Sequence, residues 1–249
     1  MAEHSSIEWT NATWNPVTGC TKLSAGCDNC YAERFSERFR GVLGHPFEPG
    51  FDLTLRPERL LHPIGWRKPK LIFVNSMSDL FHKDIPIDFV ERVFQTMERA
   101  DWHVFQVLTK RSSLMRDFVN RRYGKGGAPG HIWLGVSIEN ASTLGRLRHL
   151  KQTDAVVRFV SFEPLLGPLA AVDLTGIDWV IVGGESGPRA RGIEKDWVRD
   201  IRDQCQGQQT AFFFKQWGGR TPKSGGNQLD GRQWLEYPAV HRRDRRCER

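Results

Sequence analysis

The run Leu71-Ile72-Phe73-Val74 is followed at once by the polar stretch Asn75-Ser76-Met77-Ser78-Asp79. Four consecutive apolar residues, rich in β-branched and aromatic side chains, are typical of a strand buried on both faces. The same pattern, an apolar run that ends in polar residues, recurs along the chain. The six runs are 71–74, 104–108, 132–136, 157–160, 179–182 and 211–214. Their spacing leaves room for a crossover helix between successive parallel strands.

Helical periodicity fills several of the intervals between the runs. Ile87, Val90, Phe94 and Met97 fall on one face of a helix, as expected for an element that packs on a sheet. Helices are predicted over residues 87–98, 112–121 and 196–205. Strands that alternate with helices predict an α/β fold, namely a full or partial parallel (β/α) barrel of six to eight strand–helix units.

Two further strands are candidates near the amino end. One is the segment 52–56, and the other lies before Cys20, where Pro16 argues against a regular central strand. The length of 249 residues matches one barrel. We therefore expect a single domain over residues 1–240, followed by a basic tail over residues 241–249.

The composition limits the class of protein. A hydrophobic share of 39% and a charged share of 26% exclude a wholly disordered chain. No run approaches the roughly 18 apolar residues of a membrane helix, and nothing at the amino end resembles a signal peptide. We expect a soluble, cytoplasmic protein without membrane contact. The 36 basic and 29 acidic residues give a net charge of +7, which favours a polyanionic partner such as nucleic acid.

Ionisable or amide side chains follow nearly every predicted strand. In a parallel barrel the carboxyl ends of the strands line the active site, so these residues predict a shared polar site. Each of them has a simpler alternative: it caps the next helix, as expected for Ser112 and Asn140, or it forms a salt bridge on the rim. The candidates are Asn75, Ser76, Asp79, Lys110, Arg111, Ser137, Glu139, Asn140, Glu163 and Glu185.

Three of the five cysteines lie within eleven residues. Cys20, Cys27 and Cys30 have the spacing C-x6-C-x2-C, and the last two can reach one metal from a tight turn. A disulfide framework is not expected in a long cytoplasmic chain. A redox pair would leave Cys20 unexplained. An iron–sulfur cluster held by three thiolates fits the trio and leaves one iron with an open position.

A structural zinc ion is the main alternative to the cluster. It needs a fourth ligand, and no histidine stands at the spacing of a zinc finger. The available histidines are His45, His62 and His82. The isolated cysteines Cys205 and Cys247 are expected to be inert.

Several strings resemble a known family. The amino-terminal segment combines Trp14-Asn15-Pro16, Thr18-Gly19-Cys20 and Gly26-Cys27-Asp28-Asn29-Cys30-Tyr31-Ala32-Glu33. Downstream stand Leu108-Thr109-Lys110-Arg111, Phe162-Glu163-Pro164-Leu165 and Gly183-Gly184-Glu185-Ser186-Gly187. Together they resemble the phage-associated three-cysteine-motif family, whose fold and cluster suggest a radical S-adenosylmethionine enzyme. The ending Cys30-Tyr31 is similar to that of spore photoproduct lyase, a radical enzyme that repairs DNA.

The resemblance implies cofactors and a reaction. Cys20, Cys27 and Cys30 would bind a [4Fe-4S] cluster whose open iron chelates S-adenosylmethionine. Reductive cleavage of that cofactor, with an electron from a donor, yields a radical that abstracts hydrogen from the substrate. The spacing departs from the usual C-x3-C-x2-C signature, in which an aromatic residue rather than Asn29 precedes the last cysteine.

The resemblance also implies roles for the residues at the strand ends. A methionyl amine would be held by Asn75, Ser76 and Asp79, and the ribose hydroxyls by Ser137, Glu139 and Asn140. Lys110 or Arg111 would pair with the methionyl carboxylate. The predicted catalytic residues, which contact the substrate or transfer protons, are Glu163, Glu185 and Lys110.

The substrate predicted from charge and resemblance is a nucleic acid or nucleotide, modified or repaired by the enzyme. Members of the family are commonly encoded beside a partner protein, so a complex is also expected. Two alternatives stay open. One is a nucleic-acid-binding module whose cluster is structural or senses redox state, and the other is a zinc-containing barrel without radical chemistry.

Overall fold

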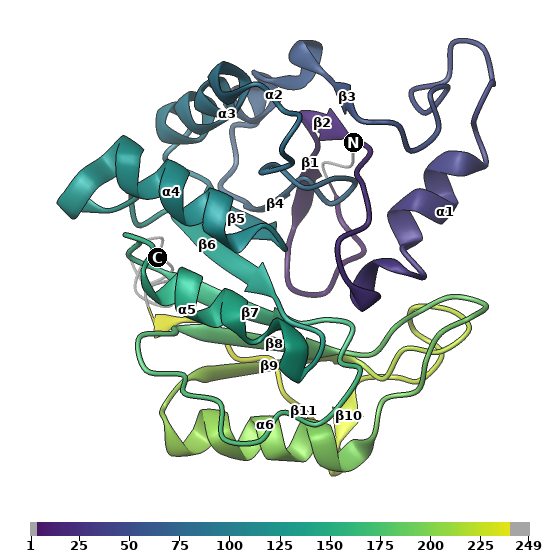
Figure 1. The fold of residues 1–249 in the computed structure, drawn as a ribbon, viewed down its shortest axis with the longest axis vertical. Helices are drawn as coiled ribbons and strands as arrows, with labels where there is room; N and C mark the ends of the chain where they lie inside the picture. Colours follow the sequence, from purple (N-terminus) through teal and green to yellow (C-terminus); the bar gives the residue numbers. More distant parts are fainter. Residues whose placement is uncertain (1–3, 240–249) are drawn as a thin grey trace. The chain divides into compact units, whose positions relative to one another are not determined.

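The computed structural model of the chain describes residues 4–239, and its centre is a parallel sheet of seven strands (Figure 1). The strands follow one another in the order β1-β4-β5-β6-β7-β8-β9. They are β1 (Ala12–Trp14), β4 (Leu71–Val74), β5 (Val104–Thr109), β6 (Ile132–Ser137), β7 (Arg158–Phe162), β8 (Trp179–Gly183) and β9 (Ala211–Gln216). The predicted α/β fold with a parallel sheet is confirmed.

Each of the six apolar runs forms one strand of this sheet, with ends shifted by at most two residues. The seventh strand, β1, is the one expected before Cys20. It ends at Trp14, two residues before Pro16, and pairs only with β4. Because β1 and β9 stand at the two ends of the strand order, the sheet is open, and the partial form of the barrel is correct.

Helices connect most of the parallel strands. They are α1 (Tyr31–Glu37), α2 (His62–Gly65), α3 (Ile87–Arg99), α4 (Ser112–Tyr123), α5 (Gly145–Lys151) and α6 (Lys195–Gly207). Residues 163–178, between β7 and β8, contain no helix. The three predicted helices are confirmed as α3, α4 and α6. The expected buried face of α3 is wrong at Ile87, which is exposed, because Phe89 and Val93 complete that face instead.

Short elements complete the described chain. The predicted strand over residues 52–56 is reduced to β3 (Thr54–Leu55), which pairs antiparallel with β2 (Val17–Thr18) outside the large sheet. Near the carboxyl end, β10 (Gln228–Leu229) and β11 (Arg232–Gln233) form a second small antiparallel pair. The 3-10 turns are η1 (Ala25–Cys27), η2 (Pro57–Arg59), η3 (Gly124–Gly126) and η4 (Ala141–Thr143).

The contacts of the chain group it into two compact units. Within the described residues, unit 1 comprises residues 4–134 and 153–156, and unit 2 comprises residues 135–152 and 157–239. The expectation of one domain over residues 1–240 therefore stays a prediction, and the expected basic tail lies outside the described residues. No helix among residues 4–239 is long and apolar enough to cross a membrane.

Each unit has its own aromatic core. In unit 1 the ring of Phe94 on α3 packs on Phe118 of α4, with 4.8 Å between the centroids. In unit 2 the ring of Trp179 lies edge-on to Phe213, with 6.0 Å between the centroids. Burial of such large rings supplies much of the hydrophobic stabilisation of each unit.

The open edge of β9 is covered by a later segment of unit 2. The backbone N–H of Phe214 donates to the carbonyl of Trp234 at 2.8 Å, and the N–H of Glu236 donates to the carbonyl of Phe212 at 3.1 Å. Phe213 and Leu235 face each other as an antiparallel bridge. Residues 234–236 therefore act as a short strap along the last strand of the sheet.

Gly135 of β6 is required by the packing of unit 2. A Cβ atom at this position would lie 2.5 Å from the ring atom Cζ of Phe159. We expect Gly135→Ala to lower the free energy of unfolding by about 1–3 kcal/mol, because the ring must move from its packed position. Urea denaturation followed by circular dichroism measures this change.

The matched control is Gly145→Ala on α5, where a Cβ atom meets nothing within 4 Å. It should leave the urea concentration at the unfolding midpoint unchanged or raise it, since alanine favours the helix. Equal effects of the two substitutions would contradict the packing argument.

Candidate functional site

In unit 1 the cysteine loop is attached to the carboxyl end of β4. The N–H of Gly19 donates to the carbonyl of Met77 at 3.0 Å, and the Ser78 hydroxyl donates to the carbonyl of Val17 at 2.9 Å. Gly19 has a φ of 82°, and a Cβ atom there would lie 2.2 Å from the carbonyl oxygen of Asp52. Only glycine fits this position. Cys20 is therefore delivered to the end of the strand where the sequence predicts the site.

Asp79 joins the end of β4 to the end of β5. Its Oδ1 accepts hydrogen bonds from the Thr109 hydroxyl at 2.7 Å and from the N–H of Phe81 at 3.0 Å. Its Oδ2 accepts from the N–H of Lys110 at 3.1 Å. The carboxylate is buried and holds its neighbours in position, and its expected contact with a methionyl amine stays a prediction.

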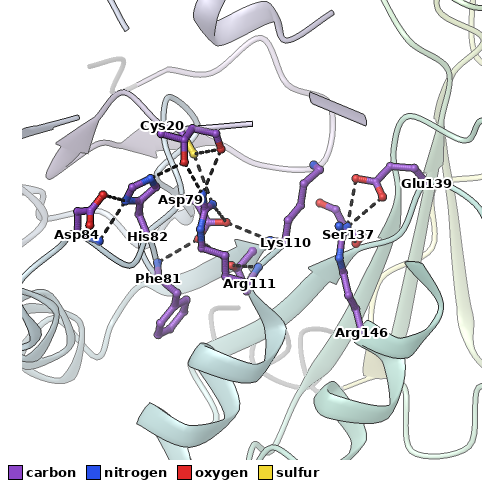
Figure 2. Close-up of polar contacts among 12 residues, drawn as sticks. Cys20, Asp79, Phe81, His82, Asp84, Lys110, Arg111, Ser137, Glu139 and Arg146 are labelled. Carbon is purple, nitrogen blue, oxygen red and sulfur yellow. Dashed lines mark hydrogen bonds and ion pairs between the residues drawn. The ribbon is translucent and has the colours of Figure 1, made fainter. Parts of the chain in front are cut away.

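Arg111 connects Asp79 to the cysteine loop (Figure 2). Its Nη1 lies 3.1 Å from Oδ2 of Asp79 and 3.5 Å from Sγ of Cys20. Its Nη2 donates to the carbonyl of Thr21 at 3.1 Å and to the Thr21 hydroxyl at 3.2 Å. One buried guanidinium thus fixes two consecutive residues of the loop.

Thr21 is also held from the other side by His82. The His82 Nδ1 accepts the N–H of Asp84 at 3.2 Å, so the proton resides on Nε2, which donates to the Thr21 hydroxyl at 2.7 Å. Burial, with the charge of Arg111, lowers the pKa of His82, so the ring is neutral at pH 7. His82, one of the histidines considered for zinc, is a support of the loop.

The three cysteine thiols lie close enough to influence one another. Cys27 acts electrostatically on both Cys20 and Cys30, and all three are partly buried and reduced. Burial and the Asp79 carboxylate raise the pKa of Cys20. Burial raises the pKa of Cys30, while the N–H groups of Glu33 and Ala32 act in the opposite direction. The Cys20 and Cys30 thiols therefore keep their protons until a metal displaces them.

Positive charge lies beside two of the three sulfurs. The Arg111 guanidinium contacts Cys20, and the charge of Lys110 acts on Cys30. Within residues 4–239, no group of three or more His, Cys, Asp or Glu side chains is arranged to hold one metal ion. The structure therefore brings the three predicted cysteines into one neighbourhood without a converging set of ligands for a single ion.

Asn75 differs from the other candidates at the end of β4. It has a φ of 60°, its side chain is 2% exposed, and neither amide atom has a hydrogen-bond partner. A buried amide without partners is costly and is a common mark of a site that a ligand completes. The neighbouring Ser76 is engaged, since its hydroxyl accepts a hydrogen bond from the Asn15 amide at 3.1 Å.

In unit 2 the residues after β6 are tied together by Arg146. Its Nη1 donates to the carbonyl of Ser137 at 2.7 Å and lies 3.0 Å from Oε2 of the fully buried Glu139 (Figure 2). Asn140 caps η4, and its Oδ1 accepts the N–H of Ser142 at 3.0 Å. The expected helix cap at Asn140 is confirmed, whereas the one expected at Ser112 is wrong, because Arg111 is the N-cap residue of α4 and Ser112 is its first helical residue.

The two remaining acidic candidates of unit 2 are also paired. Glu163 lies 2.8 Å from the ammonium of Lys215 and accepts the Ser161 hydroxyl at 3.0 Å. Arg191 grips Glu185 with its Nη2 at 2.6 Å and its Nε at 3.0 Å. The salt-bridge alternative thus describes all three candidate glutamates of this unit, and their cofactor and catalytic roles stay predictions.

Several supporting residues were not predicted as members of the site. Four of them pair with an acidic residue that lies at an irregular interval or on another strand, and Thr21 pairs with Arg111 and His82, far away in sequence. Helical and strand periodicity therefore give no signal for these contacts. The supporting residues are Thr21, Thr109, Arg146, Lys215 and Arg191.

Comparison with known proteins gives a family and a distant likeness. Residues 4–238 match the model of a family described as "Protein of unknown function (DUF5131)". No curated protein sequence matches the chain.

Two solved structures are similar in fold. One is a spore photoproduct lyase complexed with dinucleoside spore photoproduct, with 12% sequence identity over 76% of this chain and a TM-score of 0.44. The other is a mutant lyase with bound AdoMet and the same photoproduct, with 11% identity over 77% of this chain and a TM-score of 0.44. This chain spans 58% and 60% of the lengths of those lyase chains.

We expect Asp79→Asn to destabilise unit 1 strongly, because it leaves the buried Arg111 guanidinium without its counter-ion. The expected loss is about 3–5 kcal/mol in the free energy of unfolding. Hydrogen exchange should also accelerate at residues 19–30, since Arg111 no longer holds the cysteine loop in place.

Glu98→Gln is the matched control. Glu98 pairs with Arg122 at 2.9 Å in the same unit, but its side chain is 30% exposed. Its loss should cost no more than about 1 kcal/mol and leave exchange in the loop unchanged. A cost for Asp79→Asn no greater than that of the control would show that the Asp79–Arg111 pair does not organise the loop.

Proposed function

We propose a function for this chain, which belongs to the DUF5131 family, from the chemistry of its cysteine site. It is an iron–sulfur enzyme of the radical S-adenosylmethionine type that modifies or repairs a nucleic acid or nucleotide. One observation carries the proposal: the cysteine loop is attached to the carboxyl ends of β4 and β5, where Arg111 contacts the sulfur of Cys20. Ligands bind at this edge of parallel α/β sheets.

The three thiols suit a cubane better than a single ion. A zinc ion with sulfur ligands at about 2.3 Å needs all its ligands to converge on one point. In a cubane, each thiolate binds its own iron, so the sulfurs can stand farther apart. Cys27 acts on both other thiols, and Arg111 and Lys110 offset the negative charge that a thiolate cluster brings. We therefore assign Cys20, Cys27 and Cys30 to a [4Fe-4S] cluster.

S-adenosylmethionine is the cofactor proposed for the open position of the cluster. When bound there, the pair supplies an organic radical by one-electron reduction. The chain contributes the unpaired amide of Asn75, which suits the methionyl amine. Lys110 is proposed to pair with the methionyl carboxylate, since Arg111 is already committed to Asp79 and the loop.

Substrate and partners follow from charge and resemblance. The net charge of +7 favours a phosphate-rich substrate. The resemblance to the phage-associated three-cysteine-motif family implies a partner protein encoded nearby, and a reductive cluster requires an electron donor. For Glu163 and Glu185 we retain substrate contact or proton transfer as roles, with Lys215 and Arg191 holding each carboxylate in position.

A second candidate function is a nucleic-acid-binding protein whose cluster serves structure or redox sensing. The observation that favours it is the pairing of all three candidate glutamates of unit 2 with cations. Paired carboxylates are poorer proton acceptors than free ones, which suits a binding role better than acid–base catalysis.

Anaerobic reconstitution with iron and sulfide tests the proposal. The protein should gain about four irons and the visible absorbance of a cluster, and it should release 5′-deoxyadenosine from S-adenosylmethionine when dithionite is added. Alanine at Cys20, Cys27 or Cys30 should abolish both signals, because the two remaining thiolates do not suffice to hold a cluster that needs three protein ligands.

Cys205→Ala is the matched control, since Cys205 is buried in α6 and its burial raises its pKa to about 12. It should retain the cluster and the cleavage. Zinc without iron and sulfide in anaerobically purified protein would contradict the proposal. An intact cluster that never cleaves the cofactor would favour the second candidate.

Asn75→Gly separates cofactor binding from folding. Glycine accepts the positive φ of this position, and removal of a buried amide without partners costs little, so stability should change by no more than about 1 kcal/mol. The affinity of the reconstituted protein for S-adenosylmethionine should fall about tenfold or more, measured by calorimetry, with the cluster absorbance unchanged.

Ser36→Ala is the control for this substitution. Ser36 also has a buried hydroxyl without a partner, but it lies on the buried face of α1, near the end of that helix. It should leave the affinity unchanged. Full affinity in Asn75→Gly would remove Asn75 from the cofactor site.

A further inference from the structure

Helix α1 begins immediately after Cys30 and exposes a stripe of aromatic and basic side chains. Tyr31, Arg34, Phe35 and Arg38 stand at positions i, i+3, i+4 and i+7, so they share one face of the helix and its last turn. Tyr31 is 48% exposed and Phe35 is 43% exposed. The opposite face, with Ala32 and Ser36, is buried. In Figure 1, α1 stands at the periphery of its unit, apart from helices α2, α3 and α4. We call these four residues the α1 stripe.

The acidic residues of α1 are neutralised by cations from outside the stripe. Glu33 pairs with Lys22 at 3.0 Å, and Glu37 pairs with Arg40 at 2.6 Å. Among residues 4–239, no carboxylate pairs with Arg34 or Arg38. The stripe therefore carries positive charge that no carboxylate of the described chain offsets, and this charge favours an anionic partner.

The aromatic rings restrict what that partner can be. Tyr31 and Phe35 lie one helical turn apart, about 6 Å along the axis, and Arg34 and Arg38 have the same separation. The Phe35 ring packs against the rings of Phe39 and Phe47, with centroids at 5.3 Å and 5.5 Å. A supported ring beside unpaired arginines suits a partner that offers flat apolar faces and anions at a similar repeat.

We propose that the α1 stripe binds single-stranded or unpaired nucleic acid, with bases stacked on Tyr31 and Phe35 and phosphates held by Arg34 and Arg38. A duplex hides the faces of its bases in the stack, so the rings select unpaired nucleotides. An acidic protein would satisfy the arginines but offers no regular series of flat faces.

The α1 stripe specifies the substrate of the proposed enzyme as unpaired nucleic acid, and this step rests on the proposed function. Tyr31 follows the third cysteine directly, and its hydroxyl donates to the carbonyl of Ser76, next to Asn75. A nucleic-acid strand bound along α1 would therefore pass beside the cysteine site. Enzymes that act on a base need it outside the stack, and the stripe holds it in that state.

The test is fluorescence anisotropy with the full chain as purified and a labelled single-stranded oligonucleotide, against a duplex of the same sequence. Wild type should prefer the single strand. Phe35→Leu keeps an apolar side chain on Phe39 and Phe47 but removes the stacking face, and it should weaken binding about tenfold. Arg38→Gln should make the plot of the logarithm of the association constant against the logarithm of the salt concentration less steep, by about 0.7 in slope, because one phosphate contact is lost.

Arg121→Gln is the matched control, since Arg121 is an exposed arginine on α4 of the same unit. It should leave affinity and salt slope unchanged. Arg38 is exposed and has no ion-pair partner in residues 4–239, so its substitution should leave the free energy of unfolding unchanged. If Phe35→Leu is unstable, the affinity and salt dependence of Arg38→Gln alone test whether the stripe binds nucleic acid.

Equal affinity for single strand and duplex, no binding of either, or unchanged affinity in both stripe variants would overturn the assignment of the stripe. The outcome is separate from that of the proposed function. Cluster assembly and release of 5′-deoxyadenosine are measured without any oligonucleotide, so the enzyme can be established while the stripe is rejected, and the reverse.

Discussion

The ion pair between Asp79 and Arg111 organises the candidate site. Asp79 gathers the ends of β4 and β5, and Arg111 extends from it to Cys20 and Thr21. Because both partners are buried, each depends on the other, and the cysteine loop depends on both. The parallel sheet provides an edge, and this single pair fixes the cysteine loop to that edge.

The sequence predicts the sheet well because its strands are buried on both faces. A strand such as Trp179–Gly183, all of whose residues are buried, has to be a continuous apolar run, and such runs are visible without a structure. Helices α3 and α6 are likewise marked by their periodicity. The three-residue edge strand β1 and the two-residue β3 are too short to produce a pattern, so their bounds come only from the structure.

The sequence predicts where the site lies, but it does not predict which hydrogen bonds and ion pairs each residue of the site makes. Strand ends identify Asn75, Asp79 and Arg111 as polar residues of one edge. Which of them is saturated and which is free depends on contacts across the sheet: Asp79 is enclosed by donors, whereas the amide of Asn75 has none. Ion pairs such as Glu163–Lys215 join strands far apart in sequence, and no local spacing encodes them.

The strap over residues 234–236 protects the edge of β9 from pairing with other molecules. An uncovered terminal strand presents a row of unpaired backbone groups to which a strand of another molecule can add. In β9 the groups of Phe212 and Phe214 are already occupied by the strap, within the same chain. A chain cut short before Trp234 would expose that row on a phenylalanine-rich strand and would tend to assemble edge to edge into aggregates.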